Sequence, residues 1–327
     1  AVGMGRAFHD ASPAARVVFE EAGAALGFDI AKLCFEGPES ELQLTANTQP
    51  AVLTVSVAGA RLLAERGVVP AVVGGHSLGE YTALTASGVL GFDEGVRLVC
   101  ERADAMHQAG IDNPGTMAAV LGLDDDQVEI ACRRADADVW VANFNAPGQV
   151  VIAGSTEGVA AASTHAKELG AKKVMPLPVS GAFHTPFMTP ARDRLRKAIA
   201  EANPRDCEVP VVSNVDALAH SEGSEWSSLL SAQLGSPVRW KHCLLTLAEL
   251  GVTDLAELGP GGVLTGMAKR TLDGARTISV ATPEDLDKLI EWVSATAPVA
   301  QQHEGEHLFA VERLVVYRDQ LTLEVRR

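Results

Sequence analysis

The stretch from residue 68 to residue 86 constrains the fold of this chain more than any other. Val68 to Gly74 is a short apolar run rich in valine, which is typical of a buried strand. Gly75-His76-Ser77-Leu78-Gly79 follows it, and Glu80 to Ala86 is compatible with a helix. A serine between glycines at a sharp strand-to-helix turn is how an α/β enzyme presents a nucleophile. The stretch therefore predicts an α/β protein with Ser77 as the nucleophile, and a structural turn is the alternative.

Helices are expected before and after this strand. Residues 6–66 read as mainly helical, and a helix is expected over Pro50 to Arg66, with Pro50 in its first turn. Gly67 can adopt the left-handed conformation that closes a helix. Asp93 to Ala109 has the spacing of a half-exposed helix. These boundaries leave the apolar run that starts at Val68 free to form the strand.

The sequence pattern after residue 112 changes to short alternating strands and helices, which indicates a second, smaller domain. The predicted elements are a strand at 116–123, a helix at 124–135, strands at 139–143 and 149–153, a helix at 156–169 and a strand at 172–179. The order βαββαβ is the ferredoxin-like arrangement. We therefore expect a ferredoxin-like domain at 113–179, inserted into a discontinuous large catalytic domain at 1–112 and 180–293, with a linker and tail at 294–327.

The alternation of helices and strands resumes beyond residue 186. Helices are expected at 190–202 and 240–250, and strands at 209–214 and 254–258. Such alternation implies a parallel sheet covered on both faces, so the large domain is expected to be α/β-hydrolase-like. In the tail, 308–316 and 321–325 are candidate strands.

Composition and charge exclude several classes of function. The 327 residues carry a formal net charge of −15, which argues against nonspecific binding to nucleic acid or to an anionic membrane. The sequence lacks both an apolar stretch long enough to span a bilayer and the charge pattern of a signal peptide, so a cytoplasmic location is expected. The 5 cysteines are scattered without a C-x-x-C pair, which favours reduced structural thiols and no metal site.

A serine hydroxyl becomes nucleophilic only when a base removes its proton. Among the 9 histidines, His184 is the best placed, because it follows a predicted strand and precedes a turn, where a parallel sheet exposes its working side chains. His76 adjoins the serine in sequence, so its side chain is expected to point elsewhere and to support the turn. A structural histidine is the alternative interpretation of His184.

Six motifs in this order resemble the malonyl-CoA:acyl carrier protein transacylases of fatty-acid synthesis and the related acyltransferase domains of polyketide synthases. The resemblance spans residues 1–293. The motifs are Gly75-His76-Ser77-Leu78-Gly79-Glu80, Asn143-Phe144-Asn145-Ala146-Pro147-Gly148-Gln149, Gly181-Ala182-Phe183-His184, Ser213-Asn214-Val215, Pro237-Val238-Arg239-Trp240 and Gly259-Pro260-Gly261.

The resemblance implies a role for each of several residues. Ser77 would be acylated, and His184 would act first as general base and then as acid. Arg102 would bind the free carboxylate of the substrate, since an arginine fork selects malonyl over acetyl by charge and shape. Gln233 matches the family position whose carbonyl orients the histidine. On sequence alone, Arg102 is equally well a solvated helix residue, and Gln233 is a polar helix residue.

Two neighbours of these residues bear on specificity. Phe183 and Leu78 resemble the malonyl-selective pattern of the family, because a bulky ring crowds a methyl branch on the acyl α-carbon; ordinary core packing is the alternative. In the family, the N–H of the residue after the nucleophile, here Leu78, contributes to the oxyanion hole. The family opens with a strand and a Gly-Gln-Gly-Ser-Gln loop, whereas this sequence begins with Ala1-Val2-Gly3-Met4-Gly5. The strand-like segment after Leu308 is a candidate to take the place of that strand.

The resemblance implies that malonyl-CoA acylates Ser77 and that the phosphopantetheine thiol of an acyl carrier protein collects the malonyl group, with no cofactor. Two alternatives stay open. One is an α/β-class serine hydrolase, although no acidic residue stands in a recognisable triad setting before His184. The other is a carrier-protein-binding module that is inactive because it lacks the N-terminal oxyanion loop.

Overall fold

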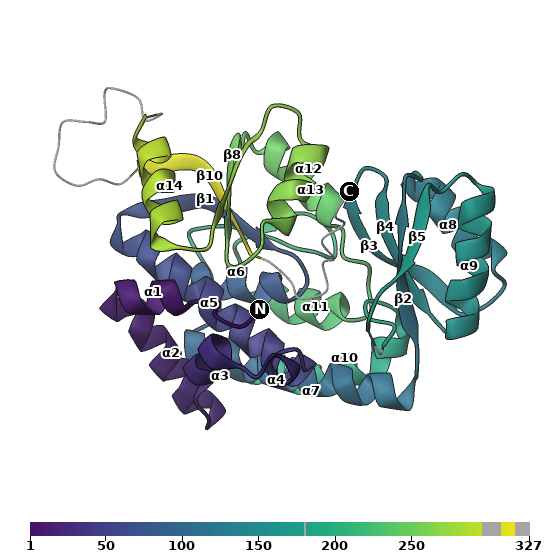
Figure 1. Cartoon of the computed structure of the whole chain (residues 1–327), viewed down its shortest axis with the longest axis horizontal. Helices are drawn as coiled ribbons and strands as arrows, with labels where there is room; N and C mark the ends of the chain where they lie inside the picture. Colours follow the sequence, from purple (N-terminus) through teal and green to yellow (C-terminus); the bar gives the residue numbers. More distant parts are fainter. Residues whose placement is uncertain (180, 296–308, 318–327) are drawn as a thin grey trace.

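The structure is a computed structural model that describes residues 1–179 and 181–295, together with the backbone of 309–317. It contains two sheets (Figure 1): a six-stranded sheet surrounded by helices, and a four-stranded sheet at one end of the molecule with two helices of its own. The coarse prediction of a mixed α/β protein is confirmed. None of the helices in this described part is long and apolar enough to cross a membrane.

The N-terminal region is helical, as predicted. Its helices are α1 (Arg6–Ala11), α2 (Pro13–Leu26), α3 (Ile30–Glu36), α4 (Glu39–Leu42) and α5 (Thr45–Glu65). The prediction that Pro50 lies in a first helical turn was wrong, because α5 begins at Thr45 and contains Pro50 in its interior. A proline there forfeits one backbone hydrogen bond, but the stretch from Gln49 to Gly59 that follows is buried, and its packing holds the helix. Gly67 closes the region with a φ of 72°.

The large sheet places the strand before Ser77 near its centre. The strand order is β7-β6-β1-β10-β8-β9, and all pairings are parallel except that of β6 with β7. The strands are β1 (Val68–Gly75), β6 (Val211–Val212), β7 (Ala219–His220), β8 (Asp254–Leu258), β9 (Arg276–Val280) and β10 (Phe309–Tyr317).

One predicted strand of this sheet is shorter than expected, and one in the tail lies where it was predicted. The strand expected at 209–214 is reduced to the two residues of β6. The tail segment expected at 308–316 is β10, which pairs with β1 on one side and with β8 on the other. The strand expected at 321–325 lies outside the described residues.

Alternating side chains of the large sheet pack into two separate cores. Val72, Val212 and Leu255 point to the face covered by α12 (Trp240–Glu249) and α13 (Val263–Thr271). Their neighbours Val73, Val211 and Ala256 belong to the larger core, which also contains residues of α2, α5, α6 (Leu78–Ala86), α7 (Phe92–Asp112) and α14 (Pro283–Ala295). Helices therefore cover both faces of the sheet, as a parallel sheet requires.

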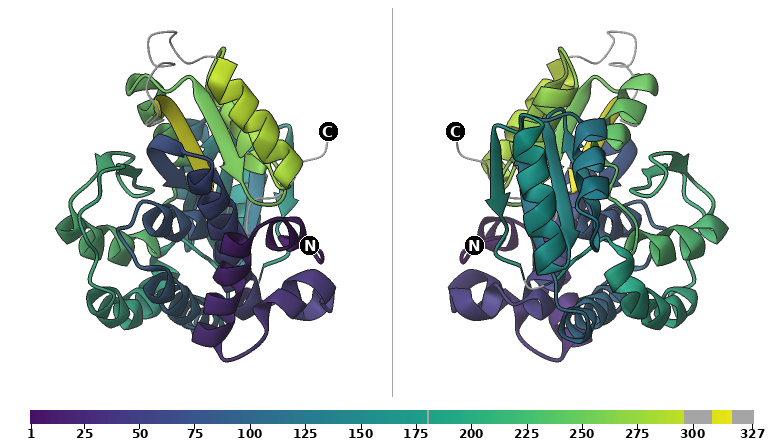
Figure 2. Two further views of the ribbon diagram at one scale, coloured as in Figure 1. Left: turned by 90° about the vertical axis from the view of Figure 1, so that its left-hand side faces the viewer. Right: turned by 90° about the vertical axis from the view of Figure 1, so that its right-hand side faces the viewer.

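The smaller sheet is antiparallel, with the strand order β3-β4-β2-β5. Its two helices lie side by side over one face (Figure 2), and its core is separate from the two others. All six elements expected between residues 116 and 179 are present, with boundaries that differ by at most a few residues. They are β2 (Thr116–Leu121), α8 (Asp125–Arg134), β3 (Val139–Ala146), β4 (Gln149–Gly154), α9 (Thr156–Glu168) and β5 (Lys173–Pro176).

Strand β3 connects the two sheets. Asn143 of β3 forms a parallel bridge with Val238, which precedes α12. Arg270 of α13 donates a hydrogen bond from Nη2 to Gln149 Oε1 at 2.5 Å, and Lys241 of α12 forms an ion pair with Asp125 of α8. The remaining helices, α10 (Thr189–Glu201) and α11 (Gly223–Gln233), follow the short η1 turn (Pro186–Met188) in the chain and lie on the large-sheet side.

Candidate active site

Ser77 lies in a strained turn between the end of β1 and the start of α6. Its backbone has φ 51° and ψ −103°, a conformation that few residues other than glycine adopt. Gly75 is required by packing, because a Cβ on Gly75 would overlap the carbonyl group of Gly79 and would lie 2.6 Å from the amide nitrogen of Glu80. The Ser77 N–H donates to Asn214 Oδ1 at 2.7 Å, which fixes the turn from outside.

His184 contacts Ser77 directly. The distance between Ser77 Oγ and His184 Nε2 is 2.8 Å, and the other ring nitrogen, Nδ1, lies 2.9 Å from the backbone carbonyl oxygen of Gln233. A carbonyl oxygen only accepts hydrogen bonds, so Nδ1 carries the proton and Nε2 is left as the acceptor for the serine hydroxyl. The side chain of Gln233 does not contact the ring in this arrangement; its main chain does.

Arg102 brings a positive charge to Ser77. Its Nη2 donates to Ser77 Oγ at 2.8 Å and to Gln233 Oε1 at 3.3 Å, and its Nη1 donates to Gln49 Oε1 at 2.5 Å. The guanidinium carbon lies 5.2 Å from the ring centre of Tyr81, a cation–π distance. Within the described residues, no carboxylate forms an ion pair with Arg102. A buried guanidinium held by neutral groups is a binding position for an anion.

Arg102 and Arg97 lie on the same helix, α7, but differ in burial. Arg102 is only 1% exposed, whereas Arg97 is exposed and pairs with Asp93 one turn away. Sequence alone left open whether Arg102 was solvated. Its spacing on α7 gave no signal, because the burial comes from α5, α6 and α11, which surround it with Gln49, Tyr81 and Gln233.

Glu80 and Asn214 belong to the same network, although sequence reasoning gave them no role. Glu80 is fully buried; it accepts a hydrogen bond from the Asn214 backbone N–H at 2.7 Å and another from the side-chain amide of Gln233. Burial raises the pKa of Glu80 to about 7, against the opposing effect of these hydrogen bonds and of the Arg102 charge. The available signal was a carboxylate in the first turn of an otherwise apolar helix.

The other predicted residues lie around this centre. His76 points away from Ser77, as predicted: its Nε2 is 2.8 Å from Asn145 Oδ1 of β3, and its ring packs edge-on against Trp240. Leu78 and Phe183 are buried members of the large core. The N–H of Leu78 is the first in α6 and lies among the amides for which a helix offers no acceptor of its own.

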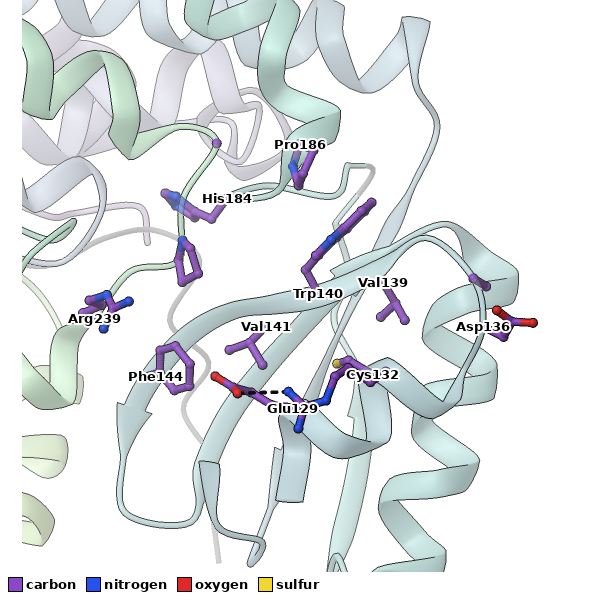
Figure 3. Close-up of a pocket in the computed structure, with 14 residues that line it drawn as sticks. Glu129, Cys132, Asp136, Val139, Trp140, Val141, Phe144, His184, Pro186 and Arg239 are labelled. Carbon is purple, nitrogen blue, oxygen red and sulfur yellow. Dashed lines mark hydrogen bonds and ion pairs between the residues drawn. The ribbon is translucent and has the colours of Figure 1, made fainter. Parts of the chain in front are cut away.

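A cavity of about 590 Å³ leads from the surface to His184. It lies between the small sheet and the segment before α12, and Figure 3 shows Trp140 and Phe144 of β3 on one side with His184 and Arg239 facing them. A cavity of this volume lies in the range of small-molecule binding sites. It is lined by Glu129, Cys132, Arg133, Asp136, Ala137, Val139, Trp140, Val141, Phe144, His184, Pro186, Gly235, Pro237 and Arg239.

Metal chemistry has no visible basis in the described ranges: they contain no cluster of three or more His, Cys, Asp or Glu side chains arranged to hold a metal ion. The cysteines at 34, 100, 132, 207 and 243 are unpaired.

Comparison with known proteins defines the class first. Residues 2–287 match the family model described as the acyl transferase domain, which makes this α/β protein with its buried Ser–His–Arg centre an acyltransferase. A "Malonyl CoA-acyl carrier protein transacylase" of Bacillus subtilis (strain 168) is 41% identical over 293 residues, covering 89% of this chain and 92% of the relative. The chain belongs to the malonyl CoA-acyl carrier protein transacylase family.

Solved structures agree with this assignment. An acyl carrier protein S-malonyltransferase from Vibrio cholerae O1 biovar eltor has a TM-score of 0.86 and 41% identity, covering 88% of this chain and 95% of its own. A malonyl-transacylase solved in complex with a type II PKS acyl-carrier protein has a TM-score of 0.86 and 38% identity, covering 89% and 95%. Similarity of this extent shows that the arrangement of helices and sheets is shared over most of the chain.

Proposed function

We propose that this protein transfers a malonyl group from malonyl-CoA to the phosphopantetheine thiol of an acyl carrier protein, through a malonyl ester of Ser77. The observation that carries the proposal is the position of Arg102, a buried cation 2.8 Å from Ser77 Oγ with neutral hydrogen-bond partners. An acyl group that ends in a free carboxylate can pair directly with this guanidinium. Relatives and structural neighbours whose printed names include malonyl transfer and an acyl carrier protein support the same substrates.

The first half-reaction acylates the serine. His184 Nε2 accepts the proton of Ser77 Oγ while Oγ attacks the thioester carbonyl carbon. The oxyanion that forms is stabilised by the N–H of Leu78 at the N-terminus of α6. When the tetrahedral adduct collapses, the C–S bond breaks and the imidazolium returns its proton to the CoA sulfur, which leaves as a neutral thiol.

The second half-reaction reverses these roles with a different thiol. His184 Nε2 accepts the proton of the phosphopantetheine thiol while its sulfur attacks the malonyl ester. The bond between the malonyl carbonyl carbon and Ser77 Oγ then breaks, and Oγ takes the proton back from His184. The cavity beside His184 is where the two long pantetheine arms would enter in turn, because it reaches the base from the surface.

A neutral group orients the base in this site. Gln233 offers a carbonyl to His184 Nδ1 at 2.9 Å, where hydrolases of the Ser-Asp-His type use a carboxylate. A carbonyl stabilises the imidazolium less than a carboxylate does. Because thiol and serine esters react readily, the weaker base suffices for reversible acyl exchange.

The domain description is part of the proposal. We assign residues 1–112 and 180–293 to an α/β-hydrolase-like catalytic domain and residues 113–179 to an inserted ferredoxin-like domain, with a linker and tail at 294–327. The antiparallel strand order β3-β4-β2-β5 and the separate core of the small sheet support this division. The specificity roles of Phe183 and Leu78 and the cytoplasmic location remain proposals of the same kind.

Intact-protein mass spectrometry after mixing with malonyl-CoA tests the function. We expect a gain of one malonyl group that requires Ser77, is absent in Ser77→Ala and is discharged by holo acyl carrier protein. Ser224→Ala, at an exposed serine of α11, is the matched control and should acylate normally. Adduct loss to water without carrier protein would favour the hydrolase alternative, and no adduct at all would favour the inactive binding module.

A further inference from the structure

We propose that the Glu80 carboxylate is a positioning residue that aligns the nucleophile, the base and the substrate-binding arginine by holding Asn214 and Gln233. The inference rests on the proposed function and deepens it. Glu80 has no hydrogen bond to Ser77 Oγ or His184 among the described residues and does not line the cavity; each of its oxygens instead accepts a hydrogen bond from a residue that is itself bonded to Ser77.

One oxygen of Glu80 fixes the turn that carries Ser77. Glu80 Oε1 accepts from the Asn214 backbone N–H at 2.7 Å. The side chain of Asn214 in turn accepts from the Ser77 N–H through Oδ1 and donates from Nδ2 to the Gly75 carbonyl oxygen, both at 2.7 Å. Asn214 therefore forms hydrogen bonds on both sides of the strained turn, and Glu80 holds the backbone N–H of Asn214 in place.

The other oxygen fixes Gln233. Glu80 Oε2 accepts from Gln233 Nε2, which also donates to the Ser77 carbonyl oxygen at 3.0 Å. This leaves Gln233 Oε1 facing Arg102 and the Gln233 main-chain carbonyl facing His184. A rotation of the Gln233 amide would present an N–H to the guanidinium, where two donors repel, and would disturb the residue that sets the histidine tautomer.

Only the ionised form of Glu80 satisfies this geometry. Both oxygens face N–H donors, so a proton on either one would replace an acceptor with a donor. The surroundings include Arg102 of α7, Asp216 of the loop after β6, Cys243 of α12 and the adjacent Tyr81, of which only Arg102 favours the negative charge. Because burial opposes that charge and raises the pKa of Glu80 to about 7, protonation falls within an accessible pH range.

The test is the pH dependence of Ser77 acylation by malonyl-CoA in the full chain, comparing wild type with Glu80→Gln. In wild type, full activity needs both His184 and Glu80 deprotonated, so below about pH 7 the logarithm of the rate should at first fall with a slope steeper than one. In Glu80→Gln only His184 remains, and the slope should be about one. We also expect a rate lower by roughly 10²-fold at neutral pH, typical of misaligned reacting groups.

Glu257→Gln is the matched control, because Glu257 is the other fully enclosed glutamate near the large sheet and contacts the Thr265 N–H of α13, away from Ser77. It should keep the wild-type slope and rate. A wild-type rate and slope in Glu80→Gln would overturn the inference. If that variant does not fold, a slope that nowhere exceeds one in the wild-type enzyme overturns it, and a slope steeper than one below about pH 7 supports it. Failure of the proposed function is distinct, since wild type itself would then form no malonyl-Ser77.

Discussion

The hydrogen-bond partners of the buried Arg102 guanidinium are neutral. This choice of residues leaves the guanidinium able to pair with a carboxylate. A carboxylate partner would satisfy the guanidinium permanently, whereas Gln49 and Gln233 hold it in place without neutralising it. The Arg102 Nε has no hydrogen-bond partner among the described residues. The guanidinium therefore keeps the capacity to pair directly with a carboxylate, as the proposed binding of the malonyl group requires.

Arg102→Ala should remove the preference for malonyl over acetyl groups. Two charge-assisted hydrogen bonds are worth about 3 kcal/mol together, so acylation by malonyl-CoA should fall by roughly 10² to 10³-fold. Acetyl-CoA has no carboxylate that could bind Arg102, so its rate of Ser77 acylation should change by less than about threefold. Rates of Ser77 adduct formation with both thioesters give the comparison. The control is Arg97→Ala on the same helix, which should alter neither rate; an undiminished malonyl preference in Arg102→Ala would contradict the assignment.

Sequence reasoning found the residues whose chemistry is visible in a motif. Ser77 between its glycines and His184 after a strand both carry local signals, and the structure brings their side chains to 2.8 Å. The burial of Arg102 and the network around Glu80 could not be predicted, because they depend on side chains from α5, α6 and α11 converging in space. A buried carboxylate looks like any helix-starting glutamate until its neighbours are known.

At the scale of elements, the junction of β1 with α6 is the most demanding feature of the chain. The chain must leave the strand, turn sharply through a positive φ at Ser77, and begin a helix whose first turn packs against Gly75. Helix periodicity and the terminating glycine predicted the neighbouring elements well, because both are local properties. The length of β6 and the start of α5 were not predictable in this way, since pairing with β1 and burial against the core decide them.

Gly75→Ala should disrupt this junction, while Gly74→Ala should not. A methyl group at residue 75 overlaps the Gly79 carbonyl group, so the backbone must move, with a loss of about 3 kcal/mol or more in unfolding free energy and of most acylation. At residue 74 the nearest atom to a new Cβ is 3.8 Å away, an ordinary contact. Chemical denaturation and malonyl-adduct formation measure both effects. Equal stability and activity in the two variants would show that the close approach at Gly75 is not required.

At the scale of the whole molecule, the charge needed at Glu80 opposes folding. Its pKa rises from 4.5 to about 7, so below pH 4.5 the group is protonated whether the chain is folded or not and costs nothing. As pH rises, Glu80 ionises in the unfolded chain before it ionises in the folded chain. The free energy of unfolding therefore falls until about pH 7. The loss amounts to about 3 kcal/mol, from the size of the pKa shift.

This loss is measurable as a difference between wild type and Glu80→Gln. The unfolding free energy of wild type minus that of the variant should fall by about 3 kcal/mol between pH 4.5 and pH 7.5, since glutamine does not titrate. Glu94 and Asp285 have lowered pKa values and act in the opposite direction, but they are common to both proteins and cancel. Denaturant titrations across this range provide the values. A pH-independent difference would mean that Glu80 is not ionised at a cost in the folded protein.

The order of the strands in the large sheet has a consequence for synthesis on the ribosome. β1 carries Ser77, and it pairs along its whole length with β10, so that Val68 lies beside Phe309 and Gly75 beside Tyr317. At about 5–20 residues per second, β1 emerges many seconds before its neighbour. During that interval β1 and β8 each present an open edge, which is prone to mispairing with other chains. Completion of this sheet therefore waits for the synthesis of β10, and the edges of β1 and β8 that it covers stay open until that strand emerges.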